Sequence, residues 1–136
     1  MLAWLGRYAV AAAVFGVLDG LWLGIVARPL YDDQLGDLLA ADPNAVAAVA
    51  FYVIYVLGIT FFATRPALAE ESGRTALVHG GLLGLVAYAT WDLTNLAVLE
   101  GFPAGVVLVD LAWGTIATAV TALVTYAVCR RVPALG

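Results

Sequence analysis

Three aspartates interrupt long apolar stretches of this sequence, and their carboxyl groups are the side chains best suited to chemistry. Asp19 lies in VFGVLDGLWLGIVA (14–27), Asp92 in ATWDLTNLA (89–97) and Asp110 in VVLVDLAWGT (106–115). A carboxyl group surrounded by hydrocarbon costs at least about 2.5 kcal/mol, so such a residue is a functional-site hypothesis by default. Carboxyl groups bind cations and polar solutes or transfer protons, which makes these three the candidate catalytic residues.

Aromatic and amide side chains accompany the aspartates. Each aspartate has a tryptophan one or three positions away, in the pairs Asp19–Trp22, Trp91–Asp92 and Asp110–Trp113. An indole N–H can donate a hydrogen bond to a carboxylate, and the ring can shelter it from lipid. The predicted binding residues are Trp22, Tyr52, Tyr55, Tyr88, Trp91, Asn95 and Trp113.

The composition identifies the surroundings of these residues. Hydrophobic residues make up 64% of the 136 residues and charged residues only 12%, which is typical of an integral membrane protein. All six basic residues are arginines and they form no basic stripe, which excludes nucleic acid as a partner. One cysteine and one histidine exclude an internal disulfide and a Cys/His metal site, so no metal or cofactor is predicted.

Four apolar segments are long enough to cross a hydrocarbon core of about 30 Å at 1.5 Å per residue. They lie at about 5–28, 44–64, 75–99 and 104–129. The sequence therefore predicts an all-α, polytopic membrane protein, a four-transmembrane-helix bundle that forms a single domain over residues 1–136. A short interfacial helix is expected at about 30–40, because apolar side chains there recur with helical spacing, at Tyr31, Leu35, Leu38 and Leu39.

The arginines predict the orientation of the helices. Five of them fall at the N-terminus, in the loop between the second and third helices, and at the C-terminus, and only Arg28 falls on the other side. Positive residues concentrate in cytoplasmic loops. Both termini are therefore expected in the cytoplasm.

The three aspartates are predicted to lie at one depth. Counted from the non-cytoplasmic ends of their helices, they lie about six to nine residues in, or roughly 9–14 Å deep. We therefore expect one polar cluster in the outer half of the bilayer. Arg7 and Arg28 lie at the ends of the first helix, and no arginine lies in the middle of a helix to form a salt bridge, so we expect at least one of the carboxyl groups to carry a proton near pH 7.

Small residues indicate which helix faces pack together, because they let helices approach closely in lipid. The third helix has a stripe of Gly80, Gly84, Tyr88, Asp92 and Asn95. The fourth helix has a stripe of Asp110, Gly114, Thr118, Thr121 and Thr125. On the first helix, Ala12, Gly16, Asp19 and Leu23 lie beside a ridge of Gly16, Gly20 and Gly24. We expect all three faces to point into the bundle.

Four segments in this order, VLDGLWLG, YDDQLGDLLA, AYATWDLTNLA and VDLAWGT, carry a resemblance that extends over about residues 5–131. The chain resembles the domain of unknown function 2177 family of small bacterial inner-membrane proteins. The resemblance implies a four-helix, multi-pass protein of the bacterial inner membrane. It supplies no activity, so the functional hypotheses rest on the residues.

Three functions remain open at this point. The first is a proton-coupled unit that binds or transports a small solute, for which four helices would require a homodimer. The second is an intramembrane acid–base enzyme acting on lipid or isoprenoid chains, with Asp92 as the proton donor. The third is an accessory or structural membrane protein. A transporter needs a water route, a lipid enzyme needs a lateral opening between helices, and a structural role predicts aspartates that are fully packed and bonded.

Overall fold

The computed structural model describes residues 1–135, which form helices, turns and loops without a β-strand. Within this range four segments are long and apolar enough to cross a membrane, at Leu2–Val26, Ala45–Ala69, Gly73–Val98 and Ala104–Arg131. The prediction of an all-α bundle with four spanning helices is thereby confirmed. The α-helices are α1 (Leu2–Leu21), α2 (Arg28–Leu35), α3 (Ala45–Gly58), α4 (Arg65–Ala69), α5 (Gly73–Val98) and α6 (Ala104–Arg131).

Two of the spans contain a π-helical segment. Trp22–Val26 continues α1, and Ile59–Thr64 joins α3 to α4. Side-chain caps fix where two other helices begin. The Asn44 side-chain oxygen accepts a hydrogen bond from the Ala47 N–H at 3.1 Å at the start of α3, and Ser72 caps α5 in the same way. The loops therefore end where polar capping residues precede the apolar runs.

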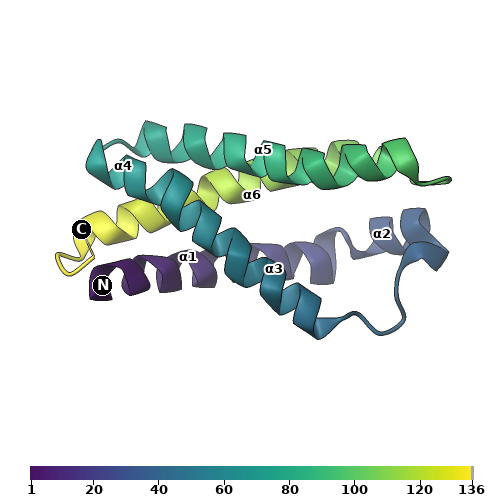
Figure 1. The fold of residues 1–136 in the computed structure, drawn as a ribbon, viewed down its shortest axis with the longest axis horizontal. Coiled ribbons are helices and arrows are strands. Elements are labelled where there is room, and N and C mark those ends of the chain that lie inside the picture. The colour runs from purple at the N-terminus through teal and green to yellow at the C-terminus, as the bar shows by residue number, and fades with distance from the viewer. Residues whose placement is uncertain (136) are drawn as a thin grey trace.

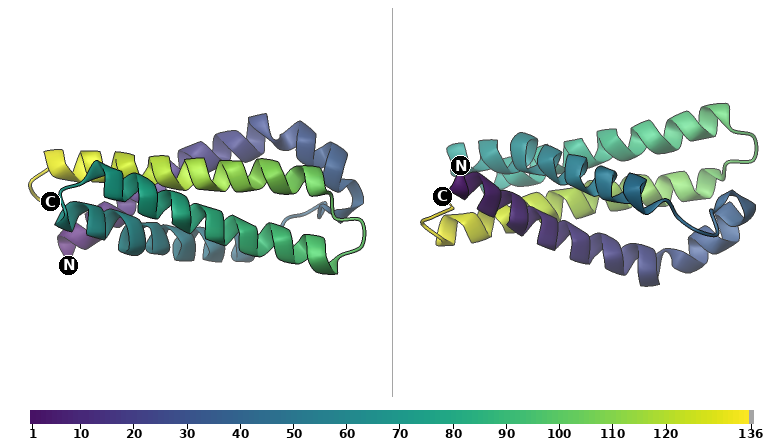
Figure 2. Two further views of the ribbon diagram at one scale, coloured as in Figure 1. Left: turned by 90° about the horizontal axis from the view of Figure 1, so that it is seen from above. Right: turned by 60° about the horizontal axis from the view of Figure 1, so that its bottom comes forward.

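Helices α5 and α6 lie side by side along their whole length and form the centre of the bundle (Figures 1 and 2). A Cβ atom added at Gly80 would lie 2.8 Å from the Thr118 carbonyl oxygen and 2.9 Å from the Ala119 Cα, so the two backbones approach as closely as glycine permits. Gly84 meets Gly114 in the same way. The predicted stripe of α6 is buried throughout, at Asp110, Gly114, Thr118, Thr121 and Thr125.

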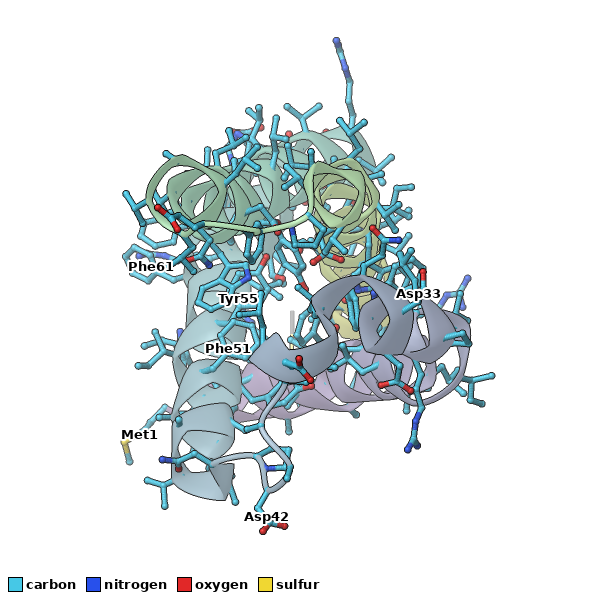
Figure 3. All side chains as sticks on the ribbon, turned by 90° about the vertical axis from the view of Figure 1, so that its right-hand side faces the viewer. Met1, Asp33, Asp42, Phe51, Tyr55 and Phe61 are labelled. Atoms are coloured by element: carbon cyan, nitrogen blue, oxygen red, sulfur yellow. The ribbon has the colours of Figure 1, made fainter. Side chains whose placement is uncertain are left out.

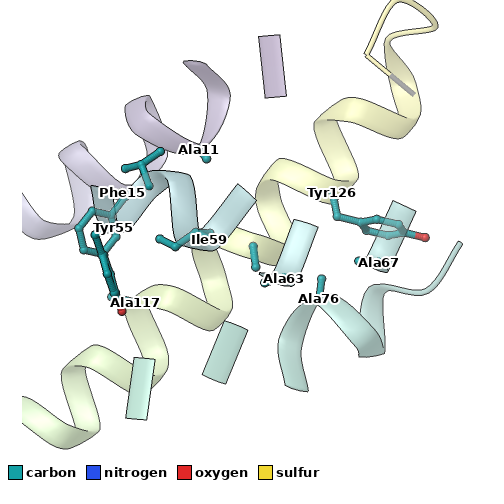
Figure 4. Packing of buried hydrophobic residues seen from close by; sticks show 11 residues of the cluster. Ala11, Phe15, Tyr55, Ile59, Ala63, Ala67, Ala76, Ala117 and Tyr126 are labelled. Atoms are coloured by element: carbon teal, nitrogen blue, oxygen red, sulfur yellow. The ribbon is translucent and has the colours of Figure 1, made fainter. Parts of the chain in front are cut away.

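Helix α1 packs on α6 through a face that differs from the predicted one. Ala11, Phe15 and Asp19 are buried, and Figure 4 shows Ala11 and Phe15 in the core. The glycine ridge faces outward, because nothing lies within 4 Å of a Cβ added at Gly16 or Gly20, and the same holds at Gly24. The prediction that this ridge points into the bundle is wrong. Phe15 lies on the buried face instead, and its ring contacts two tyrosines of α3. A buried aromatic ring makes far more contacts than bare glycine backbone.

The bundle is closed at one end and open at the other. At the closed end, which holds both termini, the segment Ile59–Thr64 packs against α5 and α6. Toward the other end α3 crosses α1 and diverges from α5, as Figure 1 shows. Helix α2 lies at this open end beside the π-helical segment of α1 and the start of α6.

Candidate functional site

A cavity of about 980 Å³ lies at the open end, with walls from α1, α2, α3, α5 and α6. We call it the aspartate cavity. Its polar lining residues are Asp19, Tyr31, Tyr88, Thr90, Thr94, Asn95 and Asp110. Its other lining residues are Trp22, Leu23, Leu35, Leu38, Leu39, Phe51, Ala87, Trp91, Leu99, Phe102, Val106 and Trp113. The walls are thus mainly apolar and aromatic, with two carboxyl groups among them.

Asp19 is bonded to two other helices. The Tyr52 hydroxyl of α3 donates a hydrogen bond of 2.5 Å to Asp19 Oδ2, and the Trp113 Nε1 of α6 donates one of 3.2 Å to Asp19 Oδ1. The residue is only 3% exposed. One carboxyl group therefore connects α1, α3 and α6 at the edge of the cavity.

Asp110 is bonded to the short helix α2. The Tyr31 hydroxyl donates a hydrogen bond to Asp110 Oδ1, and the Trp22 Nε1 donates one of 3.1 Å to the Tyr31 oxygen. The Trp22 ring stacks on Trp113, with 4.3 Å between ring centroids and 3° between ring planes. Since Trp113 also bonds Asp19, hydrogen bonds and one tryptophan stack link the two carboxyl groups.

Tyr31 is a site residue that the sequence did not assign. The sequence placed it on the apolar face of the expected interfacial helix, and this face lines the cavity through Tyr31, Leu35, Leu38 and Leu39. Burial raises the pKa of Tyr31, and its hydrogen bond to the Asp110 carboxyl group raises it further, so the hydroxyl remains a donor at neutral pH. One signal in the sequence could have identified Tyr31 as a site residue: it carries a hydroxyl group on a helix face that otherwise consists of leucines.

Asp92 is placed differently from the other two aspartates. It is 0% exposed and is not among the lining residues of the aspartate cavity. Neither of its carboxyl oxygens has a hydrogen-bond partner among residues 1–135, and the same holds for the buried Asn95 Nδ2. Asp92 lies within electrostatic reach of Asp110, and Asp110 within reach of Asp19. The structure therefore brings Asp19 and Asp110 to one cavity and leaves Asp92 buried behind its wall.

The tryptophans do not bond the aspartates beside which they stand in the sequence. Trp113 donates to Asp19 of another helix, and Trp22 donates to Tyr31. Trp91 is 64% exposed. Consecutive helical residues point about 100° apart, so Trp91 points away from the buried Asp92 and lines the cavity instead. The long indoles at the other two positions reach across to the adjacent element instead.

The remaining predicted residues surround the cavity in different ways. Tyr88 and Asn95 line it, whereas Tyr52 takes part through its bond to Asp19. The Tyr55 hydroxyl lies 2.7 Å from Thr118 Oγ1, in the closed part of the bundle. In the part of the chain that the structure describes, no group of three or more His, Cys, Asp or Glu side chains is arranged to hold a metal ion.

A second depression adjoins the aspartate cavity on the side of α3 and α5. We call it the lateral groove; its volume is about 560 Å³, and it is lined by Phe51, Ile54, Tyr55, Leu57, Gly58, Phe61, Phe62, Leu83 and Ala87. Phe51 of α3 and Ala87 of α5 line both spaces. The aspartate cavity and the lateral groove are therefore neighbours, separated at Phe51 and Ala87.

Comparison with known proteins identifies the family. A family model described as "Predicted membrane protein (DUF2177)" matches residues 4–127. The chain belongs to the DUF2177 family. No curated protein and no solved structure matches it. This DUF2177 chain is thus a multi-pass integral membrane protein that lies in a lipid bilayer, and the family description carries no activity.

Proposed function

We propose that this DUF2177 protein binds an amphiphilic molecule dissolved in the membrane, one with an apolar body and a cationic or hydrogen-bond-donating group. One observation carries the proposal: a cavity that holds two carboxyl groups within the spanning segments adjoins an apolar groove between α3 and α5. A molecule moving in the bilayer would enter by this lateral route.

The acceptor capacity of the carboxyl groups supports this choice of ligand. An ionised carboxylate has about four lone-pair positions and only accepts hydrogen bonds. Asp19 accepts two bonds and Asp110 accepts one, so both retain capacity at the cavity wall. A ligand group that donates or carries positive charge matches this capacity, and the aromatic faces of Trp22 and Trp113 suit a cation as well.

Proton-coupled transport of a solute through the bundle is less well supported. A path would have to continue along the buried threonines of α6 toward the closed end. The hydroxyls of Thr121 and Thr125 each donate 2.7 Å hydrogen bonds to carbonyl oxygens of their own helix, at Ala117 and Thr121. These hydroxyls are engaged in backbone bonds and do not form a chain of side-chain bonds, so we propose binding without passage.

An acid–base step on a bound lipid or isoprenoid chain is the second candidate function, and Asp92 favours it. A buried carboxyl group without a bonding partner, within electrostatic reach of Asp110, is suited to sharing a proton with it. A purely structural role does not account for Asp92, whose oxygens bond no other helix among the described residues. Asp92 would act behind the wall of the cavity, through Asp110.

We also propose that the membrane is the bacterial inner membrane and that both termini are cytoplasmic. Both chain ends lie at the same end of the bundle, together with the connection from α4 to α5 (Figure 1). The five arginines of the sequence-based prediction belong to these regions, and Arg28 belongs to the other end. Their distribution supports the proposed orientation.

The test is a binding titration of the protein in lipid nanodiscs with dodecylammonium as the probe. Binding is followed by tryptophan fluorescence, because Trp22 and Trp113 line the cavity. Asp19→Asn and Asp110→Asn are each expected to weaken binding about tenfold, which corresponds to about 1.4 kcal/mol. Asp37→Asn makes the same change at an exposed position outside the cavity and should leave the affinity unchanged. Equal affinities for wild type and all variants would refute the proposal.

A further inference from the structure

We infer that the lateral groove holds the hydrocarbon chain of the molecule whose polar group lies in the aspartate cavity. The inference rests on the proposed function and names the ligand class: a long-chain amphiphile with a cationic or hydrogen-bond-donating head. The head contacts the carboxyl group of Asp19, and the chain lies between α3 and α5.

The two spaces adjoin at residues from both helices. Phe51 of α3 and Ala87 of α5 belong to the linings of cavity and groove alike. Figure 3 looks onto the open end and shows Phe51 and Tyr55 pointing inward from α3, whereas Asp42 points away. A ligand with its head at Asp19 would therefore extend its chain past Phe51 into the groove.

The dimensions and chemistry of the groove suit a hydrocarbon chain. Phe51 and Phe62 mark its ends on the α3 side, and at 1.5 Å per residue they lie about 16 Å apart. This length is about half of a hydrocarbon core of about 30 Å. The only side-chain polar group among the lining residues is the Tyr55 hydroxyl, which is engaged by Thr118 Oγ1. The groove therefore offers an apolar surface as long as one bilayer leaflet.

A glycine gives the groove its depth at mid-length. A Cβ atom added at Gly58 would lie 3.9 Å from Leu83 Cδ2 and 4.0 Å from Phe62 Cδ2, which are ordinary contact distances. A larger side chain at Gly58 would extend into the groove without displacing backbone. At the far end the Arg65 guanidinium lies 5.2 Å from the centroid of the Phe61 ring. The groove thus ends beside a cation, so the positive head of the ligand belongs at the aspartate end.

The inference is tested by photo-crosslinking in nanodiscs with an alkylammonium that carries a diazirine at the end of its chain. Crosslinked residues are mapped by fragment mass spectrometry. The label is expected on groove residues of α3 and α5, and excess unlabelled dodecylammonium should remove it. Asp19→Asn should lose most of this label because the head is no longer held. Gly58→Leu should lose it several-fold, and the matched control Gly20→Leu, which extends from the outer face of α1, should retain it.

The outcomes separate the inference from the proposed function. Label spread equally over all lipid-facing helices, or confined to the aspartate cavity, would overturn the inference. If dodecylammonium binding still depends on Asp19 in that case, the proposed function stands alone, and if it does not, both fail. If Gly58→Leu does not fold, Ile54→Phe is the second variant. Ile54 lines the groove and is 68% exposed, so a larger side chain there fills the groove without disturbing the core. Unchanged groove label in that variant would also overturn the inference.

Discussion

Replacing Asp92 by valine is expected to stabilise the folded protein, although Asp92 is a fully buried residue of the central helix α5. Its carboxyl oxygens have no hydrogen-bond partner among the described residues, so the substitution removes a buried polar group and breaks no bond between helices. Valine is similar in size to aspartate and fills the same space. The opposite result is expected for Asp19→Val, which removes the acceptor of two hydrogen bonds.

The magnitudes follow from these contacts. A buried polar group without a partner costs about 1–3 kcal/mol. Valine and aspartate have nearly the same helix propensity, so Asp92→Val should stabilise by about 1–3 kcal/mol. Hydrogen bonds between membrane helices contribute about 0.6–1.7 kcal/mol each, so Asp19→Val should destabilise by roughly 1–3 kcal/mol.

The assay is reversible unfolding in mixed micelles at increasing fractions of denaturing detergent, followed by circular dichroism and tryptophan fluorescence. Asp92→Asn serves as the control, because an amide of nearly the same shape is equally unpartnered and should leave the free energy of unfolding unchanged. If Asp92→Val destabilises the protein by more than about 1 kcal/mol, the Asp92 carboxyl group is bonded in the folded state. The case for Asp92 as an unpartnered acid beside the cavity would then be lost.

Further predictions concern helix α2, the contact between α5 and α6, and the topology. Tyr31→Phe removes the hydroxyl that holds α2 to α6, so amide hydrogen exchange in α2 should become faster while exchange in α5 and α6 stays slow. Because folding raises the pKa of Tyr31 above its unfolded value of about 10, this contact should stabilise wild type below pH 10 and be lost as the pH rises further. Gly80→Ala should destabilise by about 1–3 kcal/mol, because its Cβ would lie 2.8–2.9 Å from the backbone of α6. Gly20→Ala, with open space around its Cβ, should stabilise by up to about 1 kcal/mol in the same unfolding assay. In a cysteine-free variant, a cysteine at Ala41 should react with a membrane-impermeant maleimide added to intact spheroplasts and one at Ser72 should not; the reverse labelling would refute the cytoplasmic placement of the termini.

The architecture could be predicted from hydropathy because each span must satisfy its backbone hydrogen bonds internally and therefore forms a helix. The sequence could not predict the angles between the helices. The expectation that the ridge at Gly16, Gly20 and Gly24 would be buried failed, because Phe15 provides the contact with α3 instead. The divergence of α3 from α5 has no local signal in the sequence: Ile59–Thr64 packs against α5, whereas the preceding α3 lies away from it.

The site was predictable in part for a similar reason. Carboxyl groups in apolar segments stand out in any sequence, so Asp19 and Asp110 could be found and expected at one depth. Tyr52 and Trp113 were among the predicted binding residues, but which donor bonds which carboxyl group could not be predicted. The partners lie on different helices, and sequence spacing relates only residues of one helix. Tyr31 was missed because a helix at the membrane surface was expected to contact lipid and not the interior of the bundle.

Close helix packing and the proposed binding site lie at opposite ends of this bundle, and the bilayer makes that arrangement stable. In water, the apolar walls of an open cavity would be driven together by the hydrophobic effect. In a bilayer the lipid chains are as apolar as those walls, so helices α3 and α5 can remain apart at little cost. The carboxyl groups are the exception, because lipid offers them no donor. Tyr31, Tyr52 and Trp113 supply those donors, while the close contact at Gly80 and Gly84 holds the helices together elsewhere. Substituting one of these donors should therefore alter ligand binding at the open end before it unfolds the closed end.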